Sequence, residues 1–179
     1  YNEMEKVWSA PTALKIPGVE ILGTFYSAYV APDESFILWT LPSSDVDSLG
    51  NDLFVSTRAG ETWNAPMSLG AAINTTLNEI SPYYDPITEL LFFSTNGRGS
   101  DDNYDIYYSK RLEQDWENWT LPVRADFNSP AFDAYFFMAG DSTAYFSSNR
   151  NDSLANLYLT EVMIESLAEE IEEIVEEVA

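Results

Sequence analysis

The 179-residue chain has no cysteine and no histidine. It therefore lacks the thiols and imidazoles on which disulfides, Cys/His zinc sites, thiol nucleophiles and Ser-His-Asp triads depend. Basic residues are also few: 8 Lys+Arg stand against 30 Asp+Glu, giving a formal net charge of -22. Because such a field repels phosphate groups and anionic lipid, we expect no nucleic-acid or membrane-surface partner. No apolar run reaches the roughly 18 residues that a transmembrane helix needs.

The chain does contain an internal repeat. The pattern Trp-x-x-Pro begins at Trp8, Trp63 and Trp119, at steps of 55 and 56 residues. A second pattern, Asp or Asn followed by Leu or Ile and then an aromatic residue, begins at Asp52, Asp105 and Asn156. Both patterns indicate a repeat of about 54 residues, and periods of this order are typical of propellers and other repeat folds.

Each unit contains short runs of aromatic and β-branched residues between Gly, Pro, Asn and Asp clusters, which predict strands. The predicted strands are residues 25–30, 36–40, 52–57 and 63–69 in the first unit, 79–84, 90–95, 105–110 and 119–124 in the second, and 134–138, 143–148 and 156–160 in the third. The third unit has no fourth strand. The segment that matches a fourth strand, residues 7–14, instead precedes the first unit.

Four antiparallel strands in about 40–50 residues are typical of a propeller blade. We therefore predict an all-β fold over residues 1–161, in which residues 7–14 form a lone fourth strand. The three four-stranded antiparallel units, or blades, are expected at about 19–69, 73–125 and 128–161. Residues 162–179 are expected to form an acidic amphipathic α-helix.

Several motifs resemble the TolB-type, WD40-like β-propeller repeat. They are the stretches Asp52-Leu-Phe-Val-Ser-Thr-Arg, Trp63-Asn-Ala-Pro, Asn78-Glu-Ile-Ser-Pro, Leu91-Phe-Phe-Ser-Thr-Asn-Gly-Arg-Gly and Asp105-Ile-Tyr. The first unit departs from the pattern, because residues 41–50 replace the Gly-rich loop. The resemblance implies a propeller of an exported protein in the periplasm or outside the cell. It implies no particular activity.

The loop before residue 106 is rich in oxygen ligands. Asp101, Asp102, Asn103 and Asp105 place three carboxylates and one amide within five residues. Calcium takes six to eight such oxygen ligands, so this loop is a candidate calcium site. The spacing does not fit the twelve-residue EF-hand loop, and a solvated polar loop is the alternative interpretation.

Two carboxylates occupy equivalent positions in the repeat. Glu79 follows Asn74 by five residues, and Asp133 follows Asn128 by five residues. A residue repeated in every blade usually serves the blade, for example by bonding a neighbouring strand, so we expect a structural role for both. The alternative is a carbohydrate-active enzyme, a glycoside hydrolase or lyase that uses Asp or Glu together with Tyr.

The C-terminal residues change to a helical period. Apolar residues step by three and four through Ile164, Leu167, Ile171, Ile174 and Val178. Glutamates at i and i+4 repel each other, and a short helix is marginal alone in water, so this helix must pack on something. Its apolar residues are candidate interaction residues. Their partner is either the protein's own strands, or a partner helix or another copy.

Three blades cannot close a ring, because propellers have about four to eight. Either the chain is part of a larger propeller, or two copies form a six-bladed homodimer in which residues 7–14 of one copy complete the third blade of the other. We predict a non-catalytic interaction or scaffold module that binds protein or glycan and assembles through its open blade edges and C-terminal helix. A subunit of a self-assembling surface structure is a further alternative.

Overall fold

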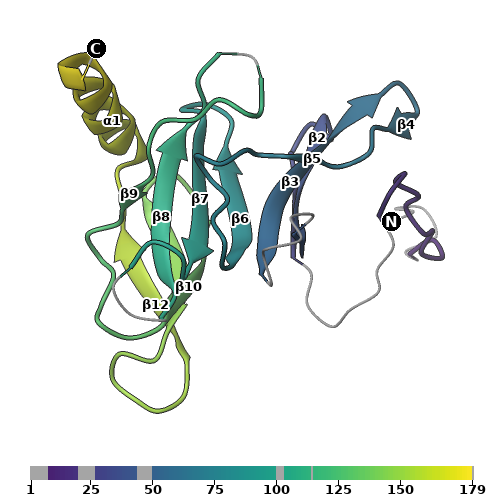
Figure 1. Cartoon of the computed structure of the whole chain (residues 1–179). Helices are drawn as coiled ribbons and strands as arrows, with labels where there is room; N and C mark the ends of the chain where they lie inside the picture. The colour runs from purple at the N-terminus through teal and green to yellow at the C-terminus, as the bar shows by residue number, and fades with distance from the viewer. Residues whose placement is uncertain (1–7, 20–26, 44–49, 100–102, 114, 179) are drawn as a thin grey trace.

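Figure 1 shows the computed structural model of the chain, which describes residues 8–19, 27–43, 50–99, 103–113 and 115–178. These residues form three antiparallel sheets and one helix. The first sheet contains β1 (Ala28–Val30), β2 (Phe36–Pro42), β3 (Asn51–Ala59), β4 (Thr62–Trp63) and β5 (Met67–Ser68). The second contains β6 (Glu79–Asp85), β7 (Leu90–Thr95), β8 (Asp105–Lys110) and β9 (Val123–Arg124). The third contains β10 (Asp133–Met138), β11 (Thr143–Ser148) and β12 (Asn156–Glu161), and α1 (Ile164–Val178) follows it.

The predicted all-β fold with a C-terminal helix is confirmed at this level. Strands β7, β8 and β11 have the predicted bounds, β2, β6, β10 and β12 differ by one or two residues at one end, and β3 is longer at both ends. Strand β1 begins at Ala28, and residues 25 and 26 of its predicted span lie outside the described residues. The fourth strands are much shorter than predicted. In the second sheet, Trp119 makes only an isolated bridge to Arg111, and the ladder resumes at Val123. The intervening Pro122 has no N–H to donate, which explains the interruption.

The N-terminal segment differs from the prediction within this single copy. Residues 8–14, predicted as a lone fourth strand, form no strand and are exposed, while residue 7 lies outside the described residues. The partner strand expected for this segment belongs to a second copy, so its pairing stays a prediction. In Figure 1 the segment lies beside the first sheet, at the opposite end of the molecule from β12.

The three sheets are stacked in a row, each in face-to-face contact with the next. Strand β6 contacts β1, β2 and β3, and β10 contacts β6, β7 and β8. Each sheet therefore lays its first strand across the face of the preceding sheet (Figure 1). The middle sheet has neighbours on both faces, which is why every residue of β7 is buried and its sequence shows no polar alternation.

Two hydrophobic clusters fill the spaces between the sheets. The first joins the first and second sheets through residues such as Phe36, Leu38, Leu53, Tyr84 and Phe93. The second joins the second sheet, the third sheet and α1, and it includes Phe92, Ile106, Phe136, Phe146 and Ile171. The stacking of the three sheets therefore depends mainly on large aromatic and aliphatic side chains.

Gly50 marks a close approach between two backbone segments. A Cβ added at this residue would lie 1.7 Å from the carbonyl oxygen of Leu77. We expect Gly50→Ala to lower the free energy of unfolding by about 3 kcal/mol in urea denaturation, because the backbone itself would have to move. Gly60→Ala is the control: its φ of 66° strains an alanine, but nothing lies within 4 Å of the added atom. A loss of about 1 kcal/mol is expected there, and equal losses would contradict the contact argument.

Candidate functional site

Two asparagines bind the backbone of the preceding sheet in the same way. The side-chain oxygen of Asn74 accepts from the Leu53 N–H at 2.8 Å, and its amide donates to the Leu53 carbonyl at 3.0 Å. Asn128 makes the same pair of bonds to Ile106, at 2.9 and 2.7 Å. Each asparagine thus replaces a strand residue at the end of a ladder. The equivalence shows that the sequence repeat is also a repeat of contacts.

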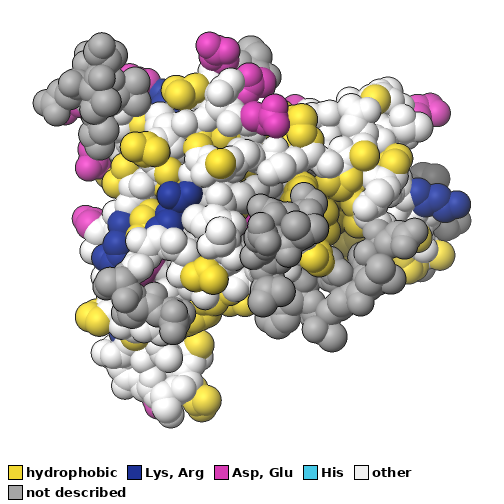
Figure 2. Space-filling view, viewed as in Figure 1, with side chains coloured by type: hydrophobic (Ala, Val, Ile, Leu, Met, Phe, Trp, Pro, Cys, Tyr) yellow, Lys and Arg dark blue, Asp and Glu magenta, His cyan; other side chains and the backbone are white. Residues whose placement is uncertain are grey.

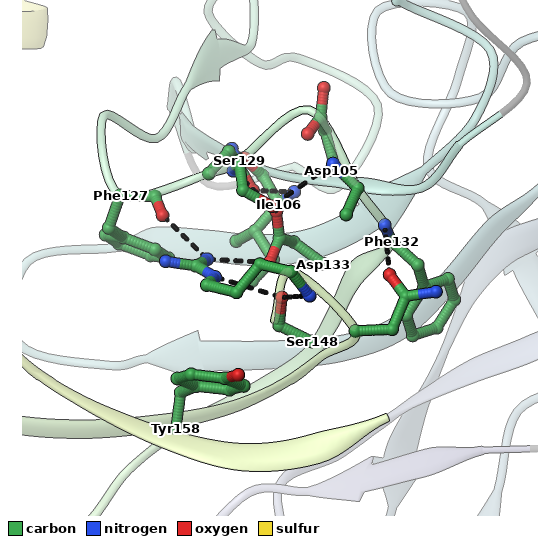
Figure 3. A network of polar contacts seen from close by, with 12 residues as sticks. Asp105, Ile106, Phe127, Ser129, Phe132, Asp133, Ser148 and Tyr158 are labelled. Atoms are coloured by element: carbon green, nitrogen blue, oxygen red, sulfur yellow. Dashed lines mark hydrogen bonds and ion pairs between the residues drawn. The ribbon is translucent and has the colours of Figure 1, made fainter. Parts of the chain in front are cut away.

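The two repeated carboxylates accept hydrogen bonds from a preceding turn and from a neighbouring strand or the loop after it. Glu79 accepts hydrogen bonds from the Thr75 N–H at 2.8 Å and from the Thr95 hydroxyl at 2.6 Å. Asp133 accepts from the Ser129 N–H at 2.6 Å and from Arg150 at 2.7 Å. Figure 3 shows Asp133 between Ser129 and Ser148, inside this network. Both carboxylates are 0% exposed, so these bonds agree with the structural role expected for them.

The pKa values of these two carboxyls move in opposite directions. Burial is the largest influence on Glu79, and it raises the pKa of that carboxyl. Burial opposes ionisation of Asp133 as well, but hydrogen bonds from Ser148, Arg150 and Ser129 outweigh it and lower its pKa. Glu79 also has hydrogen bonds from Thr75 and Thr95 and the positive charge of Arg98 nearby, which lower its pKa, but burial outweighs them.

Strands β6 and β10 each contain a bulge that bonds the preceding sheet. Ser81 and Tyr135 have positive φ angles of 50° and 61°, at the points where the strand registers shift. The Ser81 N–H donates to the Thr40 hydroxyl at 3.2 Å, and the Tyr135 N–H donates to the Ser94 hydroxyl at 3.2 Å. The contact between neighbouring sheets therefore has a repeated polar element in addition to its apolar cluster.

The outer face of the third sheet is apolar and exposed. We call this surface the end face; it comprises Phe137, Tyr145, Leu157 and Leu159, which the strand registers place on one side of the sheet. Leu157 and Leu159 are 65% and 58% exposed, and Phe137 is 44% exposed. Figure 2 shows scattered hydrophobic side chains among polar ones at the surface in the lower left of the view.

The same repeat positions are covered in the second sheet. Ile106 and Tyr108 of β8 correspond to Leu157 and Leu159, and Phe92 of β7 corresponds to Tyr145. All three of these second-sheet residues are buried, within the cluster formed with the third sheet. The end face is thus the counterpart of a surface that this chain itself uses for packing, and it is the candidate interaction site.

The opposite end of the row is partly covered. Residues of the N-terminal segment and the first sheet line a cavity of about 610 Å³, which includes Leu14, Lys15, Val30, Ile37 and Trp63. Val30 of β1 remains 51% exposed. We call this outer surface of the first sheet the front face. Its β1 residues correspond to residues of β6 and β10 that pack against a preceding sheet.

The predicted calcium loop has its two described members bound to other groups. Both carboxylate oxygens of Asp105 accept from Arg124, at 2.7 and 2.8 Å. The Asn103 amide donates to the carbonyl of Pro130 at 3.3 Å. Asp101 and Asp102 lie outside the described residues. Within the part of the chain that is described, no cluster of three or more acidic residues suited to a metal ion occurs, and calcium binding stays a prediction.

The apolar side of α1 packs on the protein's own strands. Ile164, Ala168 and Ile171 are buried in the second cluster, and Leu167 is half-buried against it. The Tyr108 hydroxyl donates to Glu170 at 3.2 Å, and Lys110 forms an ion pair with Glu172. Three of the predicted interaction residues, Ile164, Leu167 and Ile171, therefore contact the sheets of the same chain. The side chains of Ile174 and Val178 lie outside the described part, so their predicted role stays open to a partner.

The sequence predicted open blade edges but did not identify the residues of the end face, nor two arginines of the repeated network. Arg98 donates to the carbonyl of Ile73 at 3.0 Å, and Arg150 donates to the carbonyl of Phe127 at 2.9 Å. A signal was present, because each arginine follows a repeated Ser-rich strand end by a few residues. The residues of the end face correspond to the repeat positions of the third unit that have no following unit.

Comparison with known proteins gives no match to any family model, curated protein or solved structure. The TolB-type resemblance therefore rests on the sequence motifs alone. Among the described residues, no helix is both long enough and apolar enough to cross a membrane.

Proposed function

We propose that the chain is a non-catalytic interaction module made of three β-propeller blades. It assembles through its open blade faces and binds protein or glycan, as part of an exported protein in the periplasm or outside the cell. The export is what the TolB-type resemblance implies, and the protein or glycan ligand is inferred from a repeat fold whose sequence shows no complete catalytic constellation. The observation that carries the proposal is the exposed apolar end face of the third sheet.

The blade interpretation is supported by the way the sheets are stacked. Each sheet receives the first strand of the next one across its face, and the same asparagine, carboxylate and bulge contacts recur at the two junctions. Repeated junctions of this kind turn a row of sheets into a ring when enough units are present. Three units are too few, so a homodimer of six blades or a larger propeller would complete it.

Solvent exposure of the end face supports an assembly role. Monomeric soluble proteins rarely expose a large contiguous apolar patch, and such patches usually mark interaction sites. Leu157 and Leu159 are exposed apolar side chains at positions whose counterparts in the second sheet are buried. The enzyme alternative gains nothing comparable, because Glu79 and Asp133 are fully buried and hold turns.

Sedimentation velocity over roughly a hundred-fold range of micromolar concentration tests the assembly role. We expect the wild-type chain to form an associated species whose share grows with concentration. A variant with Leu157→Glu and Leu159→Glu places charge on the end face and is expected to remain monomeric with unchanged circular dichroism. A wild-type chain that sediments as a monomer at every concentration would contradict the proposal.

A further inference from the structure

Strand β12 is paired on one side only among the described residues. It forms a full ladder with β11, from Asn156 to Glu161. In the other two sheets the third strand carries a short fourth strand on its outer edge, β5 on β3 and β9 on β8. An open edge with exposed leucines is a template for another strand.

The two existing fourth strands share one register relative to Trp-x-x-Pro. The residue five positions after the tryptophan pairs with the aromatic residue of the third strand: Ser68 with Phe54, and Arg124 with Tyr107. The residue four positions after the tryptophan pairs with the residue that follows this aromatic residue: Met67 with Val55, and Val123 with Tyr108. The same sequence rule can be applied to the third Trp-x-x-Pro, which begins at Trp8.

The residues after Trp8 form no strand in this copy. Trp8 is 81% exposed and Leu14 is 60% exposed, whereas Trp63 and Trp119 are 8% and 6% exposed in their sheets. Thr12 and Ala13 are also exposed. The segment therefore carries the sequence of a fourth strand without the sheet edge that its two counterparts use.

We propose that residues 12–14 of one copy add to the outer edge of β12 in a second copy. Thr12 lies opposite Leu159, and Ala13 lies opposite Tyr158, which is the aromatic residue of the third repeat. The Leu14 N–H donates to the Leu157 carbonyl, as the Leu69 N–H does to Leu53 and the Ala125 N–H does to Ile106, both at 3.0 Å. This inference rests on the proposed interaction function and names its partner and its register.

A second copy fits better than the chain's own N-terminal segment. That segment lies beside the first sheet, at the far end of the row from β12 (Figure 1), and it lines a cavity together with Val30 and Ile37 of the first sheet. Within the chain, each short fourth strand is followed by a first strand that packs on the same sheet, as β10 follows β9. A second copy would likewise supply residues 12–14 and then β1, whose exposed Val30 would face the end face.

Engineered cysteines test the register, because the chain has none of its own. Residues directly opposite in a sheet have Cβ atoms about 4.5–5.5 Å apart, within reach of a short bismaleimide cross-linker. We expect Thr12→Cys with Leu159→Cys to give covalent dimer as the main product on a denaturing gel. The control combines Thr12→Cys with Leu121→Cys, which is 82% exposed but lies in the second unit, and it should give little dimer.

A backbone test separates strand addition from simple apolar contact. Leu14→Pro removes the N–H that would bond Leu157, while Leu14→Ala keeps it and removes most of the side chain. We expect Leu14→Pro to weaken dimerisation about tenfold, the effect of one lost interstrand hydrogen bond, and to weaken it more than Leu14→Ala does. Equal dimer dissociation constants for the two variants would overturn the backbone pairing.

The outcomes distinguish this inference from the function on which it rests. Association of the wild-type chain together with selective cross-linking at residues 12 and 159 supports both. Association with cross-linking no greater than in the residue 121 control overturns the strand addition and leaves the interaction function standing. A wild-type chain that stays monomeric overturns both.

Discussion

Replacing Phe92 with alanine is expected to lower the free energy of unfolding by about 3–5 kcal/mol. Phe92 lies in β7 and is fully buried, and its ring stacks on Phe136 of the third sheet with centroids 4.3 Å apart. It also contacts the rings of Tyr83 and Tyr108, at 6.3 and 5.7 Å. Truncation removes the central ring of the cluster and leaves a cavity between two stacked sheets.

Urea denaturation followed by tryptophan fluorescence measures this loss. Leu121→Ala is the matched control, because Leu121 is 82% exposed and its truncation should change stability by less than about 0.5 kcal/mol. Both variants should be compared at a low concentration, where association adds little to stability. A Phe92→Ala loss as small as that of the control would show that the second and third sheets are not held together by this cluster.

The sequence predicts the bounds of the central strands of the second unit better than the length of its fourth strand. Residues 90–95 and 105–110 are short apolar runs bounded by turn residues, so their limits can be found although neither alternates in polarity. The length of the fourth strand was overestimated because its residues look strand-like in sequence. Trp119 makes only one bridge, and Pro122 has no N–H to donate. Local composition does not reveal which residues of a run enter the ladder.

The candidate site was less predictable because it depends on which surfaces meet. The structural role of Glu79 and Asp133 followed from their repeated spacing, and their hydrogen bonds agree with it. The spacing of Ile164, Leu167 and Ile171 predicted a helix but fits packing on the chain's own sheets and on a partner equally well. The exposure of Leu157 and Leu159 depends on whether a sheet follows, which no single segment encodes.

Asp133→Asn is expected to lower the free energy of unfolding at neutral pH by about 3–5 kcal/mol, the usual cost of removing one partner of a buried ion pair. The side chain is 0% exposed and accepts bonds from Ser129 and Arg150, whose guanidinium would lose its counterion. An asparagine keeps the size of the side chain and one acceptor, so the loss should come from the charge. Unfolding in urea at about pH 7 measures it.

The pH dependence follows from the lowered pKa of Asp133. A carboxyl whose pKa falls on folding contributes stability above its unfolded pKa, near the ordinary value of 3.8, and loses that contribution as the pH falls through the folded pKa. The difference in free energy of unfolding between wild type and Asp133→Asn should therefore shrink in acid.

Glu79→Gln is the control at the equivalent position, since burial raises the pKa of Glu79. Its ionisation costs stability as the pH rises, so its difference from wild type should change with pH in the opposite direction. Parallel pH profiles for the two variants would contradict the opposite pKa shifts of the two carboxyls.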